Sequence, residues 1–199
     1  MDLYLFTSTL VTLFVILDPP GLLPVFLGLT RRMTRKERNA SALNASLVGG
    51  GVILLFALFG RQLLAYLHVS MPALQLAGGL LLLLVALELL QGKATETTEQ
   101  GTNVAIVPLG IPLLAGPGSI VAIMLAVDDA GDPARLLAVG LALAAAMLLV
   151  YLFLRFAGII HRVLGTSGTT LASRIAGLLL AGIAVQMSAD GVFGLIALS

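Results

Sequence analysis

Two short segments combine residue types suited to binding a small charged solute within an apolar chain. They are DPPG, residues 18 to 21, and AGPGS, residues 115 to 119. Proline removes a backbone donor and glycine permits dihedrals that other residues avoid, so each segment is expected to break a helix. Backbone groups freed at membrane depth are tolerated only where they are buried in protein or line a water-filled cavity. The two segments therefore predict a polar cavity between broken helices.

The breaks also predict which charges the cavity suits. A new half-helix is expected to begin near Gly21 and another near Gly118, and their free amides and positive dipole ends suit an anionic group. The half-helices before the breaks end in free carbonyls, which suit a cation. A zwitterion carries both charges, and the Ser119 hydroxyl is placed to hydrogen-bond its carboxylate. The predicted substrate-binding residues are Asp18, Pro19, Pro20, Gly21, Ala115, Gly116, Pro117, Gly118 and Ser119.

Asp18 is open to two interpretations. It could pair with an ammonium group or take up a proton, because an ionisable side chain within a span is a functional candidate by default. It could instead only cap a half-helix starting at Pro19, because aspartate followed by proline is an ordinary helix start. Both roles can coexist. Glu88 and Asp190 are weaker candidates for coupling, since Glu88 is expected near a charged helix end and Asp190 precedes a glycine that could stop a helix.

The composition places these segments in a bilayer. The 199 residues are 59% hydrophobic and 11% charged, whereas soluble domains are about 25% charged. The absence of cysteine excludes disulfides and thiol catalysis, and the two histidines have no partner at metal-ligand spacing. We therefore expect neither an enzyme nor a cofactor. With a net charge of +1 and its basic residues in turns, the chain is not expected to bind nucleic acid.

Six apolar stretches are long enough to cross a bilayer, which requires about 20 residues. They are residues 3–29, 40–67, 72–91, 104–127, 134–160 and 171–197. All should be helices, because lipid tolerates no unpaired backbone. The sequence thus predicts an all-α integral membrane protein with a single transmembrane domain over residues 1–199, whose first and fourth helices are broken.

The basic residues predict the orientation of these spans. They concentrate in the turn at 31–39 and near those at 92–103 and 161–170, while the opposite turns hold only Arg61 and Arg135. By the positive-inside rule, the three basic turns face the cytoplasm and both termini face outward. The expected location is the cell inner membrane.

The two halves of the chain are weakly similar. The matching features are Ala77-Gly78 with Ala176-Gly177, Gly92 with Gly191, and DPPG at 18–21 with AGPG at 115–118. Each half holds three predicted spans, so the second half must enter the membrane from the opposite side. This is the pattern of an inverted-topology repeat, here residues 1–92 and 103–199, and matched broken spans in such a repeat point to a transporter's binding site.

Four segments together resemble the MarC family of six-span bacterial and archaeal inner-membrane proteins. They are DPPGLLPVF at 18–26, SMPALQLAGGL at 70–80, IVPLGIPLLAGPGSI at 106–120 and SRIAGLLLAGIAVQMSADG at 173–191. The likeness runs nearly end to end and also places the chain near the LysE-type exporters, which share a three-plus-three plan.

Some MarC members are described as small neutral amino acid transporters. The resemblance implies alanine, glycine or serine as the substrate, while the broken helices and the repeat favour a secondary transporter, for which we expect coupling to protons. The expected partners are the bilayer, a small zwitterionic substrate and protons as the coupling ion. An exporter of other small metabolites would show the same sequence features, and a channel could use the same breaks to line a pore. The direction of transport and the oligomeric state stay open.

Overall fold

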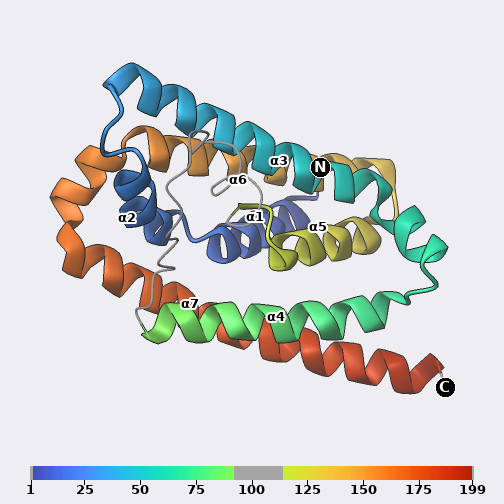
Figure 1. The fold of residues 1–199 in the computed structure, drawn as a ribbon. Helices are drawn as coiled ribbons and strands as arrows, with labels where there is room; N and C mark the ends of the chain where they lie inside the picture. The colour runs from blue at the N-terminus through green and yellow to red at the C-terminus, as the bar shows by residue number, and fades with distance from the viewer. Residues whose placement is uncertain (1, 92–113, 199) are drawn as a thin grey trace.

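The described part of the chain is entirely helical. In the computed structural model, residues 2–91 and 114–198 are described, and they form seven helices (Figure 1). These are α1 (Leu3–Leu17), α2 (Pro19–Leu29), α3 (Arg35–Tyr66), α4 (Met71–Gln91), α5 (Pro117–Ala130), α6 (Pro133–Arg155) and α7 (Ala157–Leu198). The predicted all-α class is confirmed.

Five helical segments are long and apolar enough to cross a membrane. They are Leu3–Leu23, which joins α1 to the start of α2, and the helices α3, α4, α6 and α7. Large apolar side chains are exposed along them, such as Leu55, Leu84 and Leu148. Contiguous apolar surface of this kind suits lipid rather than water. The predicted fourth span is seen only from α5 onward, because residues 104–113 lie outside the described residues.

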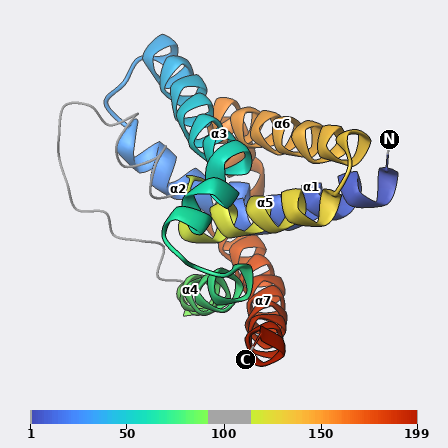
Figure 2. The same ribbon diagram turned by 90° about the vertical axis from the view of Figure 1, so that its right-hand side faces the viewer.

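The helices form three layers. Helices α3 and α6 lie on one side, α4 and α7 on the other, and α1, α2 and α5 lie between them (Figures 1 and 2). The middle layer supplies many of the most deeply buried side chains, among them Leu13, Leu23, Phe26 and Ile123. Because the two Pro/Gly segments belong to this layer, protein encloses the backbone that they interrupt.

Helices α4 and α7 pack as a close antiparallel pair. The facing residues are Pro72 with Gly191, Gly79 with Ala184, and Ala86 with Gly177. These positions recur every seven residues in both helices, which keeps them on one face, and the glycines and alanines among them are small enough to let the two backbones approach. A β-carbon on Gly79 would lie 2.8 Å from the Ala184 carbonyl oxygen. The contact therefore depends on glycine at this position.

The segment 161–170, predicted as a turn, holds a kink at Gly165 where two helical stretches of α7 meet. Helix α6 ends at Arg155, earlier than the predicted residue 160, and α7 runs through the whole segment with one non-helical residue, Gly165, at φ 65 and ψ 179. Only glycine adopts this conformation readily. The Thr169 hydroxyl donates to the carbonyl oxygens of Gly165 and Thr166, at 3.1 and 3.0 Å, and so satisfies backbone groups at the kink. The polar residues here accompany this kink, which lies within the predicted segment.

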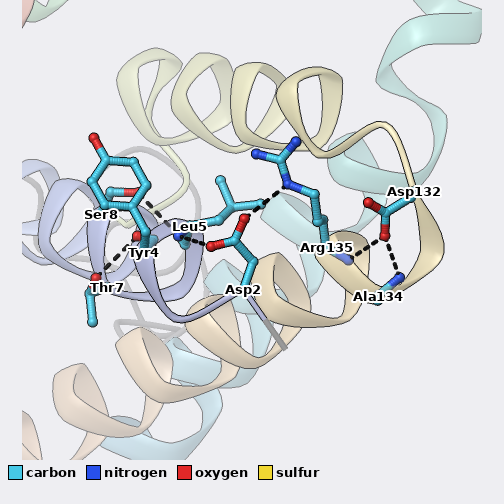
Figure 3. Close-up of polar contacts among 8 residues, drawn as sticks. All are labelled: Asp2, Tyr4, Leu5, Thr7, Ser8, Asp132, Ala134 and Arg135. Atoms are coloured by element: carbon cyan, nitrogen blue, oxygen red, sulfur yellow. Dashed lines mark hydrogen bonds and ion pairs between the residues drawn. The ribbon is translucent and has the colours of Figure 1, made fainter.

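Two ion pairs lie at one end of the layers. Arg61 of α3 pairs with Asp128 of α5 at 3.0 Å, and Arg135 of α6 pairs with Asp2, just before α1, at 3.1 Å. Figure 3 shows that Asp2 also accepts from the Leu5 backbone N–H at the start of α1. At the opposite end, Arg155 donates to the Asn39 side chain at 2.8 Å. Charged side chains thus gather where the helices leave the apolar region.

We expect Asp2→Asn to lower thermal stability slightly near neutral pH, with the difference disappearing in acid. The Leu5 N–H and the Arg135 guanidinium hold the pKa of Asp2 below its ordinary value of 3.8. A carboxyl with a depressed pKa in the folded state stabilises above its unfolded pKa and loses this contribution as pH falls through the folded pKa. Thermal unfolding of both proteins in detergent, from neutral pH to well below 3.8, checks this. A difference that persists at the lowest pH would contradict it.

Candidate functional site

Asp18 marks the break in the first span. Helix α1 ends at Leu17, Asp18 adopts left-handed dihedrals of φ 39 and ψ 62, and α2 begins at Pro19. The reason is local: Pro19 and Pro20 carry no backbone N–H, so the carbonyls four residues earlier, of Val15 and Ile16, lose their helical donors. Since α1 has fifteen residues and spans about 22 Å, the break lies deep within the span.

The Asp18 carboxylate is buried without a charged partner among the described residues. The residue is 6% exposed, and neither carboxylate oxygen accepts a well-aligned hydrogen bond from the described residues. Although Asp18 occupies the N-cap position of α2, its side chain makes no capping hydrogen bond. A carboxylate removed from water and left unpaired is strongly disfavoured. The geometry therefore suits a carboxyl group that takes up a proton or pairs with a cation.

Gly21 and Ser173 are the neighbours of this carboxylate. A β-carbon on Gly21 would overlap the Asp18 side chain and lie 2.7 Å from the Ser173 hydroxyl oxygen. The lack of a side chain at Gly21 thus lets a residue of α7 approach the break. Sequence reasoning missed Ser173, because nothing in an apolar helix distinguishes the one hydroxyl that packs against a distant carboxylate.

The second break begins α5. Gly116 is the N-cap of this helix and Pro117 its first residue. A β-carbon on Gly118 would overlap the Leu82 side chain of α4 and lie 3.5 Å from Ile16 Cγ2. Because Ile16 directly precedes Leu17 and Asp18, the two breaks adjoin through this apolar contact. Leu82 and Ile16 cover the start of α5 in this conformation.

Ser119 uses its hydroxyl within its own segment. The side chain is buried and donates to the carbonyl oxygens of Leu114 and Gly116, at 2.9 and 3.0 Å. A hydroxyl has one proton, so in this conformation none is left for the carboxylate of a ligand. Ala115 is also buried and contributes no polar side chain. The α5 backbone amides, rather than the hydroxyl, are the groups here that suit an anion.

Glu88 and Asp190 lie apart from the breaks. Both are exposed, and Asp190 accepts a hydrogen bond from Gln186 at 2.8 Å. No ion pair of Glu88 occurs in the described residues. Among residues 2–91 and 114–198, no His, Asp and Glu side chains group as a metal site would require. Of the three coupling candidates, only Asp18 is buried.

Residues 3–196 match the model of a family described as "MarC family integral membrane protein". The chain is 37% identical to a UPF0056 membrane protein of Methanocaldococcus jannaschii over 98% of both chains. It is 34% identical to one of Archaeoglobus fulgidus, over 94% of this chain and 92% of the relative. It is 31% identical to the UPF0056 inner membrane protein YhgN of Escherichia coli K12, over 93% and 94%. No solved structure matches.

Proposed function

Since the chain belongs to the MarC family of integral membrane proteins, we propose that it is a secondary transporter of small neutral amino acids, coupled to protons. One observation carries the proposal: a buried carboxyl group, at a helix break within a membrane span, with no charged partner among the described residues. Ionisable side chains in such positions mark substrate and ion pathways. The amino acid class, with alanine, glycine and serine as examples, comes from the family resemblance.

A zwitterion fits the chemistry of the two breaks. Asp18 and the freed carbonyls at the end of α1 suit an ammonium group, and the amides at the start of α5 suit a carboxylate. Because Ile16 and Leu82 cover Gly118, binding at α5 requires these two side chains to move. This requirement is consistent with a carrier that alternates between conformations.

The proposal includes six spans arranged as an inverted repeat of residues 1–92 and 103–199. The packing of the described helices supports it, because α2 contacts α6 and α7 while α5 contacts α3 and α4. A two-fold axis that exchanges the halves produces these matched contacts. It also makes the third and sixth spans, α4 and α7, antiparallel partners.

The proposed location is the inner membrane, where the E. coli relative is placed by its name. Both termini face outward, and the basic segments, residues 31–39, 92–103 and 161–170, face the cytoplasm. The segment 161–170 keeps this assignment although it is helical, because the rule depends on charge and not on secondary structure.

Uptake of radiolabelled alanine into proteoliposomes tests the function. We expect saturable uptake that is driven by an imposed pH gradient and competes with unlabelled glycine and serine, while protein-free liposomes take up none. Uptake that neither saturates nor runs against an alanine gradient would indicate a channel. If alanine, glycine and serine all fail to move under gradients of either direction, the amino acid assignment is wrong.

A further inference from the structure

We propose that Asp18 and Ser173 together bind the cation that drives transport, and thereby link the two halves of the chain. The proposed function makes this cation a proton, and a sodium ion is the alternative that the test below distinguishes. The inference rests on the proposed function and adds a second ligand that lies 155 positions further along the sequence. It also assigns α7 a part in coupling cation binding to transport.

The geometry joins the two residues at one point. A β-carbon on Gly21 would meet the Asp18 carboxylate and lie 2.7 Å from the Ser173 hydroxyl oxygen. Both polar groups therefore flank the space that Gly21 leaves. On the same helix, the Thr169 and Ser188 hydroxyls donate to backbone carbonyls. No such bond to a carbonyl is found for Ser173 in the described part of the chain. Its hydroxyl is therefore available to interact with the Asp18 carboxylate or with a bound cation.

A proton or a positive charge suits this point, because a buried carboxylate without a charged partner is strongly disfavoured. A carboxylate has only acceptors, whereas a hydroxyl both donates and accepts. If Asp18 is protonated, its O–H donates to the Ser173 oxygen. If a sodium ion binds, the carboxylate and the hydroxyl oxygen are both ligands, and the freed carbonyls of α1 supply the kind of oxygen that completes sodium sites in transporters. Ser173 has the same position in either case.

No fixed cation takes this role among the described residues. Between Leu5 and Leu29, α1 and α2 contain no titratable side chain besides Asp18. Neither of the two ion pairs in the described residues includes Asp18, and Arg174, beside Ser173, is exposed. The remaining titratable groups of the helices packed against α1 and α2 are Asp128 and Asp129 of α5, Arg135, Tyr151 and Arg155 of α6, and His161, Arg162 and Asp190 of α7. The negative charge on Asp18 is therefore left to be neutralised by an exchangeable cation, a proton or a sodium ion.

The site spans the two halves of the proposed repeat. Asp18 belongs to the first half and Ser173 to the second, and α2 packs directly against α7. Occupancy of the site by a cation therefore changes the contact between the halves. If the cation binds more tightly to one of two arrangements of α7 relative to Asp18, its binding shifts the population toward that arrangement.

Thermal unfolding of purified protein in detergent tests the site without a substrate. The variants are Ser173→Ala, Ser173→Thr, Asp18→Asn and the matched control Ser188→Ala, whose hydroxyl is bonded within α7. Titrations with protons, and with sodium chloride against choline chloride, distinguish the two cations. We expect stability of the unaltered protein to respond to one of them, and Asp18→Asn to lose that response.

Ser173→Ala should shift the half-maximal cation concentration roughly tenfold or more, because a hydrogen bond to a charged group is worth a factor of this size. Ser173→Thr should restore the normal value and Ser188→Ala should keep it. An unshifted Ser173→Ala, or an unaltered protein that responds to neither cation, would overturn the site. Alanine uptake by the same variants separates the cation site from the proposed function. If the unaltered protein responds to a cation but does not transport alanine, the cation site is supported and the assignment of alanine as substrate is wrong.

Discussion

Replacing Gly118 with valine is expected to abolish alanine uptake and to destabilise the protein by about 2 kcal/mol. Any β-carbon at this position overlaps the Leu82 side chain, which is 2% exposed, and approaches Leu82 Cγ to 2.9 Å. Because Leu82 is buried among other side chains, it has little room to withdraw. Thermal unfolding in detergent and uptake in proteoliposomes measure the two effects separately.

A double-mutant cycle with Leu82→Ala separates the steric effect of a side chain at position 118 from a role of the start of α5 in substrate binding. In Gly118→Ala with Leu82→Ala, the added methyl group occupies space vacated by the leucine, so the two changes should be coupled and stability partly recovered. If the α5 amides bind the substrate carboxylate, the affinity for alanine should be weaker in this double variant than in the unaltered protein. Normal affinity would contradict the role assigned to the start of α5.

Gly79→Leu is expected to produce the largest loss of folded protein, with a destabilisation of about 3 kcal/mol. Its β-carbon would lie 2.8 Å from both the Ala184 carbonyl oxygen and the Ser188 nitrogen. Both atoms are backbone, so the helices α4 and α7 must separate to make room. The monodisperse fraction on gel filtration and the unfolding temperature measure this effect.

Gly182→Leu provides the matched control on the same pair of helices. A β-carbon there meets nothing within 4 Å, and the residue is exposed. Leucine also has a better helix propensity than glycine, by about 1 kcal/mol. The control should therefore be neutral or slightly stabilising. If Gly79→Leu behaved like Gly182→Leu, the close pairing of α4 with α7 would be incorrect.

Local chemistry made several features predictable. The break at Asp18 follows from two consecutive prolines, and the start of α5 follows from a glycine and a proline, because these residues act on their own backbone wherever they occur. The membrane class follows equally from composition. The turn predicted at 161–170 is seen as a kink at Gly165, because one glycine at positive φ redirects the chain while the residues on either side stay helical.

The sequence by itself determined that this is a helical membrane protein of the MarC family with a broken first span and a carboxyl group at the break. Only the tertiary structure decided which side chains surround that carboxyl group: it placed Ser173 beside Asp18 and left Glu88 and Asp190 exposed. The physical reason is that lipid and protein interior are both apolar. A helix that is hydrophobic all round carries no periodic signal to show which face packs against protein, so the neighbours of Asp18 depend on the packing of all the helices together.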